Sequence, residues 1–257
     1  MSLETINLVK DNNIAVIKLN RPDLLNAVNE QLVWDFQNAT ERVKDDSTIK
    51  VVIIAGEGRG FCAGADLSER KASWKGSKDA LMRGYKPFFE NIVNMPKPVI
   101  GSISGPAAGI GAAIAMSCDL RVMSEDSYIL SVFSNIALVP DGGLSWYLPK
   151  YMGYSKAYEY AIEAKKITAD ECLKYGIANK VVSSDKLESK TLEWAKKLAK
   201  RSSQSLEHTK KLMRESLAAS YWDTFHNEAE IQNELTLSPQ NKEAVKAFFE
   251  KREPNFD

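Results

Sequence analysis

Short apolar segments alternate with amphipathic ones along the first part of the chain. Residues 6–9 and 14–19 are predicted strands, separated by the turn-forming Asp11-Asn12-Asn13. An amphipathic helix is predicted next, because apolar residues recur at spacings of four, three and four, at Leu32, Phe36, Ala39 and Val43. The continuous apolar run at 51–55 is typical of a strand buried on both faces of a parallel sheet.

The alternation continues to about residue 132 and then gives way to helical patterns. We expect a helix over 81–93 that ends before Pro96, strands over 99–104, 119–123 and 128–132, and a helix that opens within 107–116. From about residue 143 the pattern is almost wholly helical, with stripes at 188–199, 203–217 and 221–235. This order predicts an α/β core with a helical C-terminal extension. The polar, lysine-rich segment 68–78 is predicted to be a surface loop.

Composition removes several classes of function. The 34 basic and 34 acidic residues balance to a net charge of zero, which argues against nucleic acid as a partner. No apolar run approaches the ~20 residues that a membrane helix needs, and the N-terminal residues do not resemble a signal peptide. The three cysteines, Cys62, Cys118 and Cys172, have no metal-type spacing and fit a reducing cytoplasm. We therefore expect a cytoplasmic protein without a metal site.

Two segments rich in small residues follow buried strands, and they are the first candidates for chemistry. They cover residues 58–67 and 105–113. Backbone N–H groups at a strand-to-helix turn can bind a negative charge, and two that converge would form an oxyanion hole. A dinucleotide fingerprint is the rival for Gly109-Ile110-Gly111, but Ile114 stands where its third glycine belongs. Tight packing of helix on strand is the purely structural alternative.

The order of several motifs is more specific than any one of them. They are Leu19 to Ala27, Phe61 to Leu67, Pro96 to Gly101, Gly105 to Ala113, Cys118-Asp119-Leu120, Phe248 to Arg252 and Asn255-Phe256. Taken together, the chain resembles the crotonase superfamily of enoyl-CoA hydratases and isomerases nearly from end to end.

This resemblance implies a fold, a substrate and an assembly. The fold is an α/β spiral of repeated strand-strand-helix units with a helical C-terminal extension. We assign residues 1–195 to the core with the CoA and acyl site, and residues 196–257 to the helical region, with trimerisation and part of the CoA entrance. The implied substrate is an acyl-CoA thioester, so no cofactor is expected beyond the coenzyme A of the substrate itself. The implied assembly is a homotrimer or a dimer of trimers.

The resemblance also assigns individual residues. The N–H groups of Ala65 and Ile110 would hold the thioester oxygen, within turns that include Ala63, Gly64 and Gly109. Asp66 and Leu67 would lie beside the adenine, and Leu25 near the bent CoA. Lys251 matches a lysine close to the CoA entrance, although a solvated C-terminal lysine is an equal alternative.

The chain departs from the hydratase pattern at the two catalytic glutamates. Their positions fall on Ala113 and Phe133, neither of which can ionise. Asp141 remains, in Pro140-Asp141-Gly142, where some superfamily isomerases carry an acid; they include Δ3,Δ2-enoyl-CoA isomerases and the epoxyphenylacetyl-CoA isomerase. One carboxylate suffices for a 1,3-proton shift, whereas hydration needs two. The alternative role for Asp141 is the N-cap of a following helix.

Apolar residues around Asp141 are candidates for the wall of an acyl pocket or, alternatively, for core. They are Val132, Phe133, Leu138, Trp146 and Tyr147. His208 and His226 lie on predicted C-terminal helices and are taken as structural. The sequence thus favours an enoyl-CoA isomerase. A hydratase that uses Asp141 and an unidentified partner, and a catalytically weak acyl-CoA-binding subunit, are the alternatives.

Overall fold

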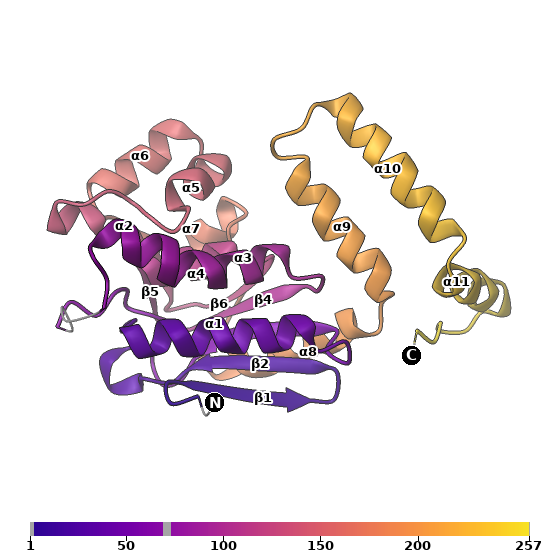
Figure 1. The fold of residues 1–257 in the computed structure, drawn as a ribbon, viewed down its shortest axis with the longest axis horizontal. Helices are drawn as coiled ribbons and strands as arrows, with labels where there is room; N and C mark the ends of the chain where they lie inside the picture. The colour runs from indigo at the N-terminus through magenta and orange to yellow at the C-terminus, as the bar shows by residue number, and fades with distance from the viewer. Residues whose placement is uncertain (1–2, 69–72, 257) are drawn as a thin grey trace.

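The computed structural model describes residues 3–68 and 73–256, which form two sheets covered by helices (Figure 1). The six strands of the larger sheet lie in the order β1 (Ile6–Asp11), β2 (Ile14–Leu19), β3 (Val51–Gly56), β4 (Val99–Ile103), β6 (Leu120–Ser124) and β9 (Lys180–Val182). β1 and β2 pair antiparallel, and every later pair is parallel. The smaller sheet has the order β5 (Pro106–Ala108), β7 (Tyr128–Leu130) and β8 (Lys166–Thr168).

The helices form two sets. The helices of one set pack on the sheets, and those of the other set extend away from them. The first set comprises α1 (Glu30–Asp45), α2 (Ser77–Asp79), the π-helix η2 (Ala80–Tyr85), α3 (Lys86–Asn94), α4 (Ile110–Ser117), α5 (Leu144–Met152), α6 (Tyr154–Ile162), α7 (Ala169–Lys174) and α8 (Leu187–Ala199). Short 3-10 turns are η1 (Pro22–Leu24), η3 (Phe133–Ile136) and η4 (Ser184–Lys186). The second set is α9 (Ser203–Glu215), α10 (Tyr221–Thr236) and α11 (Pro239–Glu250), which extend away from the sheets in Figure 1.

Strand β3 shows why the sheet is buried on both faces. Val52 and Ile54 belong to the large core that includes residues of α1, α3 and α4. Val51 and Ile53 point the other way, into a second core formed with α8. The continuous apolar run is therefore explained by alternation between two cores, as expected for a parallel strand.

Successive strand pairs are divided between the two sheets. β4 enters the larger sheet and β5 the smaller one before α4 follows, and β6, β7 and α5 repeat this order. The predicted α/β spiral of strand-strand-helix units with a helical C-terminal extension is thereby confirmed.

Helix α4 is buried along its whole length, and Arg121 holds its C-terminal end. The Arg121 guanidinium, which is almost fully buried, donates to the carbonyl oxygen of Cys118 at 2.6 Å and to those of Ala115 and Met116 at 3.3 Å. It also donates to the Tyr151 hydroxyl at 2.9 Å and to the Ile177 carbonyl. The last carbonyls of a helix need such partners, so Arg121 fixes the helix whose other end forms the candidate site.

Asp119 fastens the helical extension to the core. Its carboxylate accepts from the Val99 amide at 2.8 Å, from Lys210 at 2.8 Å and from Arg214 at 2.6 Å. Lys210 and Arg214 both belong to α9. Beyond this anchor α10 has no buried residue.

Three sequence predictions need correction or limits. The helix expected within 107–116 begins only at Ile110, because residues 106–108 pair with β7 as strand β5. The region after residue 143 is not wholly helical, since β8 and β9 lie within it. Each has three residues, too few for a period-2 pattern to be recognised. In the predicted loop 68–78, residues 77–79 form α2, and residues 69–72 lie outside the described residues. Residues 1–2 of the N-terminal segment also lie outside the described residues.

Within the described part of the chain, no helix is long and apolar enough to cross a membrane.

The role of Arg121 can be tested by Arg121→Met, which keeps much of the apolar volume and removes the donors. We expect the free energy of unfolding to fall by about 3 kcal/mol, because buried carbonyl groups lose their partners. Urea denaturation measures this change. Arg201→Met, at an exposed site, is the control and is expected to stay within about 0.5 kcal/mol of the parent. Equal losses in the two variants would contradict the assigned role.

Candidate active site

The first turn of the site is held against strand β5 by backbone hydrogen bonds. The Cys62 amide donates to the Pro106 carbonyl at 3.0 Å, and the Ala108 amide donates back to the Cys62 carbonyl at 2.9 Å. Residues 61–62 thus run beside β5 as a short strand-like segment. This pairing carries the turn at Gly64 to the end of β5, where α4 begins.

Gly64 and Gly109 bring the two turns into contact. A Cβ at Gly64 would lie 3.2 Å from the Ala108 carbonyl oxygen and 3.8 Å from the Gly109 Cα. Both glycines have positive φ, +109° at Gly64 and +53° at Gly109. L-residues rarely adopt these angles, so the close approach of the two turns depends on glycine at both positions.

The residues that follow these glycines carry amide groups with no internal acceptor. Val28 bonds to both neighbours of Ala65, through its N–H to the Gly64 carbonyl at 2.8 Å and through its carbonyl to the Asp66 N–H at 2.9 Å. The Ala65 N–H itself has no acceptor among residues 3–68 and 73–256. The Ile110 N–H also has no acceptor among these described residues. Ile110 is the first residue of α4, and the first amides of a helix lack intrahelical acceptors.

The loop that carries Asp141 sits on the first turn of α4. A Cβ at Gly142 would lie 2.5 Å from the Ala113 Cβ and 3.0 Å from the Ile110 Cδ1. On its other side it would lie 3.1 Å from the Phe89 Cζ, which comes from α3. Asp141 is therefore held beside the residue whose amide is unpaired.

The Asp141 carboxyl group is half-buried and poorly satisfied. Its Oδ1 is buried and has no hydrogen-bond partner among the described residues. Burial raises the pKa of this carboxyl group to about 6. The alternative role as a helix cap is wrong, because α5 begins after Gly143 and no side chain caps it.

Two aromatic residues that the sequence analysis did not single out complete this region. Tyr85 is the last residue of η2, and burial together with the charge of Asp141 raises the pKa of its hydroxyl to about 12. Phe89 lies one turn further on, in contact distance of the Asp141 loop. Their spacing of four residues, which puts both on one face of a helix, was the available signal.

Several predicted binding residues do lie near the two turns. Phe133 is buried, and its Cζ would be 3.9 Å from a Cβ at Gly109. The Leu25 carbonyl accepts from the Ala63 amide at 2.9 Å, which ties these two residues together. Asp66 pairs with Arg21 at 2.9 Å, and hydrogen bonds from Ser68 and Arg21 hold the pKa of Asp66 below its usual value. Leu67 is exposed beside it.

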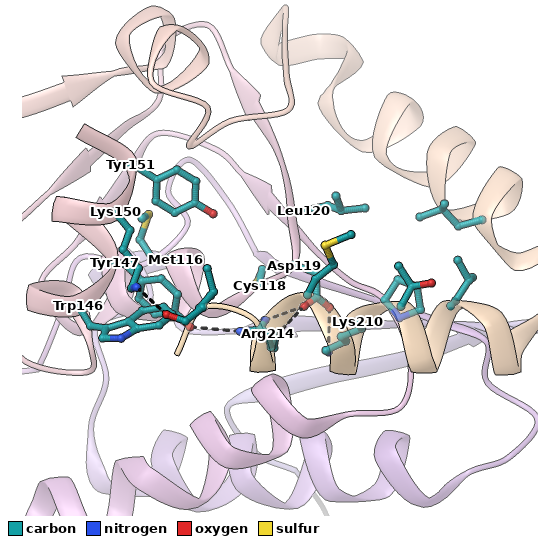
Figure 2. Close-up of a pocket in the computed structure, with 16 residues that line it drawn as sticks. Met116, Cys118, Asp119, Leu120, Trp146, Tyr147, Lys150, Tyr151, Lys210 and Arg214 are labelled. Carbon is teal, nitrogen blue, oxygen red and sulfur yellow. Dashed lines mark hydrogen bonds and ion pairs between the residues drawn. The ribbon is translucent and has the colours of Figure 1, made fainter. Parts of the chain in front are cut away.

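Three other predicted residues lie elsewhere. Trp146 lines a separate cavity of about 490 Å³ at the C-terminal end of α4, where Tyr147 and the ion pairs of Asp119 are also found (Figure 2). Leu138 is exposed and lines a depression with residues of α5 and α6. Lys251 is exposed at the end of α11, in the helical extension.

The described residues contain no group of three or more His, Cys, Asp or Glu side chains that could hold a metal ion. The cysteines at 62, 118 and 172 are buried, and burial raises the pKa of each thiol to about 12. The polar groups that the described residues bring to the two turns and the Asp141 loop thus include two amides, one carboxyl group and one phenol.

Comparisons with known proteins bear on the family and on the fold. The model of the enoyl-CoA hydratase/isomerase family matches residues 9–257. The chain is 32% identical to a probable enoyl-CoA hydratase of Rhodobacter capsulatus, over 100% of this chain and 99% of that protein. It is 29% identical to the 1,2-epoxyphenylacetyl-CoA isomerase of Escherichia coli, over 96% of this chain and 95% of that one.

Solved structures show the same fold. The crystal structure of enoyl-CoA hydratase subunit I from Geobacillus kaustophilus superposes with a TM-score of 0.92 at 28% identity, covering 98% of both chains.

The burial of Asp141 predicts a pH-dependent cost in stability. A carboxyl group whose pKa is higher in the folded than in the unfolded state favours folding below pH 4, and this contribution is lost as the pH rises through about 6. Asp141→Asn is therefore expected to gain stability relative to the parent between pH 4 and pH 8. After discounting for partial solvent exposure, the gain is about 1 kcal/mol.

Unfolding in urea at the two pH values measures this difference. Asp185→Asn is the control with the opposite sign, since a hydrogen bond from Ser183 lowers the pKa of that exposed carboxyl group. If Asp141→Asn shows no gain between pH 4 and pH 8, the carboxyl group is better solvated than its burial indicates.

Proposed function

Since the chain belongs to the enoyl-CoA hydratase/isomerase family, we propose that it is an enoyl-CoA isomerase that converts 3-enoyl-CoA to 2-trans-enoyl-CoA or catalyses a closely related rearrangement. The observation that carries this proposal is the carboxyl oxygen of Asp141 that lies buried beside the first turn of α4 with no hydrogen-bond partner among the described residues. One base in an apolar setting suits a proton shift within a bound chain.

The two amides supply the electrostatic part of the mechanism. The N–H groups of Ala65 and Ile110 donate to the thioester oxygen and stabilise the negative charge that develops there as the enolate forms. Each such donor is typically worth about 2.7–4 kcal/mol in the transition state. Their lack of internal acceptors supports this role, because donors already paired within the protein would first have to be released.

Asp141 carries the proton between two carbons. The ionised carboxylate takes a proton from C2, and the C–H electron pair moves through C1 to the thioester oxygen to give a dienolate. The protonated Asp141 then returns the proton to C4, while the double bond shifts from C3=C4 to C2=C3. The carboxylate ends as it began, so no other reactant is needed. The pKa of about 6 keeps much of the carboxyl group ionised near neutral pH and still lets it hold a proton.

Hydration is the less favoured activity. Adding water requires a group that holds and activates the water as well as one that handles the α-proton. At the two positions where hydratases carry glutamates, this chain has Ala113 and Phe133, both of them buried. A phenylalanine ring close to Gly109 also leaves less room for water.

We extend the proposal to location and assembly. α10 and α11 expose large aromatic side chains that a neighbouring subunit would cover, which supports a homotrimer or a dimer of trimers; these are Tyr221, Trp222, Phe225, Phe248 and Phe249. Three further predictions from the sequence belong to this proposal. They are the division into a core at 1–195 and a helical region at 196–257, a cytoplasmic location, and roles around CoA for Leu25, Asp66, Leu67 and Lys251.

A spectroscopic assay tests the activity. The purified protein should convert a 3-enoyl-CoA to the conjugated 2-enoyl-CoA faster than it hydrates a 2-enoyl-CoA. Asp141→Asn is expected to lower kcat by about 10²- to 10⁴-fold, since the base is lost, while acyl-CoA binding stays within a few-fold. Asp185→Asn serves as the control. Faster hydration than isomerisation would favour a hydratase, and binding without turnover of either substrate would favour a binding subunit.

The oxyanion hole is tested by Gly109→Ala. A methyl group fits the space, as its nearest neighbour would be the Val132 Cγ1 at 3.5 Å, but the φ of +53° is strained for alanine. We expect a loss of about 1–3 kcal/mol in stability together with a fall in kcat, because the Ile110 amide would shift.

Gly153→Ala is the matched control for this variant. Gly153 also has positive φ and open space around it, and it lies between α5 and α6. A similar loss of stability with unchanged kcat is expected there. If both variants keep full turnover, the Ile110 amide has no part in the reaction.

A further inference from the structure

We propose that Tyr85 is a positioning residue for Asp141, whose phenol hydroxyl faces the carboxylate across the candidate active site and keeps it ionised and oriented toward the acyl chain. The inference rests on the proposed function, since it assigns to Tyr85 an action on the base named there.

The packing of α3 places Tyr85 on the side of Asp141. Phe89 of α3 would be 3.1 Å from a Cβ at Gly142, so this face of the helix lies against the loop that carries Asp141. Tyr85 precedes Phe89 by four residues, has helical backbone angles and therefore shares that face. Both residues pack partly buried against the large core.

The segment that carries Tyr85 is firmly held. Gly84 is buried, and a Cβ there would lie 2.8 Å from the Trp74 ring. Trp74 in turn packs on Trp34 of α1, with ring centroids 5.2 Å apart. The Tyr85 ring lies 5.8 Å from the buried Phe88 ring. Single turns of π-helix are often found at functional sites, and here the turn is η2, which ends at Tyr85.

The Asp141 Oδ1, which is buried, and the Tyr85 hydroxyl have no hydrogen-bond partner in the part of the chain that the structure describes. They are close enough for the charge of Asp141 to raise the pKa of Tyr85, yet no direct bond joins them. The phenol stays protonated at neutral pH, because its pKa is about 12. It can therefore donate to the carboxylate through a small movement or through one water molecule.

Other charged groups on the elements around Asp141 are exposed or paired with each other. On η2 and α3 these are Arg83 with Asp79 and Lys86 with Glu90, and on α5 Lys150 lies over the Trp146 ring. The first turn of α4 carries no titratable side chain, and Cys62 is a buried thiol whose pKa burial raises to about 12, so it stays neutral. Tyr85 thus supplies a neutral hydroxyl donor on the helix face that packs against the Asp141 loop, while the charged groups of the neighbouring elements are exposed or paired.

This arrangement has a chemical consequence. Burial alone favours the protonated form of Asp141, which cannot abstract a proton. A facing O–H donor stabilises the ionised form, and Tyr85 exchanges no proton itself. Removing the hydroxyl should therefore raise the pKa of Asp141 without removing the base.

The test is Tyr85→Phe, which keeps the ring. We expect the acid limb of the kcat/KM profile with a 3-enoyl-CoA to move up by about half a pH unit or more. Because the parent pKa is about 6, such a shift lowers the ionised fraction at pH 7 only modestly, so we expect kcat at pH 7 to fall by about two-fold or less with KM nearly unchanged. Tyr175→Phe is the control, since Tyr175 is another half-buried tyrosine that packs on the core, and its profile should match the parent. An unmoved acid limb in Tyr85→Phe, or an equal shift in Tyr175→Phe, would overturn the proposal.

A second measurement separates this proposal from the proposed function. The pKa of Asp141 can be followed by NMR titration of ¹³C-labelled aspartate, with the signal assigned through Asp141→Asn. A higher pKa in Tyr85→Phe than in the parent supports the positioning role even if 3-enoyl-CoA is not the substrate. If Asp141→Asn abolishes turnover while the Asp141 pKa is the same in both proteins, the isomerase mechanism stands and the role of Tyr85 is rejected.

Discussion

The candidate site depends on the contact between two glycine turns. Gly64 and Gly109 approach so closely that a side chain at Gly64 would lie against the backbone at Ala108 and Gly109. Each turn then leaves the following amide, that of Ala65 or Ile110, without an acceptor in residues 3–68 and 73–256. A buried N–H group without an acceptor costs about 1–3 kcal/mol of folding free energy. The two turns can therefore keep this contact only if hydrogen bonds elsewhere in the structure stabilise them. Strand β5, which pairs with residues 61–62 and leads directly into α4, provides that support.

Other parts of the core hold the helix that carries one of these turns. α4 is buried throughout, and Arg121 satisfies its C-terminal carbonyls, whereas the Ile110 amide at its start has no acceptor among the described residues. One end of the helix is therefore fully bonded within the protein and the other is not. The Asp141 loop adds a further destabilising group, a carboxyl group that burial disfavours in its ionised form. Such groups are typical of sites in which stability is given up for reactivity.

The sequence predicted the parts of the site that depend on local backbone chemistry. The two glycine-bearing turns and the buried strands before them follow from residue types at fixed spacing, whereas Asp141 was singled out through the resemblance to superfamily isomerases. Side chains that reach the site through tertiary packing were not predictable in this way. Trp146 and Leu138 are near Asp141 in sequence, but α5 turns Trp146 toward the far end of α4. Tyr85, more than 50 positions away in the chain, lies on the helix face that packs against the Asp141 loop, since Phe89 of the same face contacts Gly142. The short strands β8 and β9 were missed for a different reason, since three residues carry no measurable periodicity.

The Asp141 loop and the first turn of α4 constrain each other. A Cβ at Gly142 would lie 2.5 Å from the Ala113 Cβ and 3.0 Å from the Ile110 Cδ1, so the loop can approach α4 this closely only with glycine at 142. Ala113 is itself fully buried, so a longer side chain at this position would have to displace its neighbours. An ionisable side chain there would in addition lose its hydration. The packing that half-buries Asp141 therefore also disfavours a second acid at position 113.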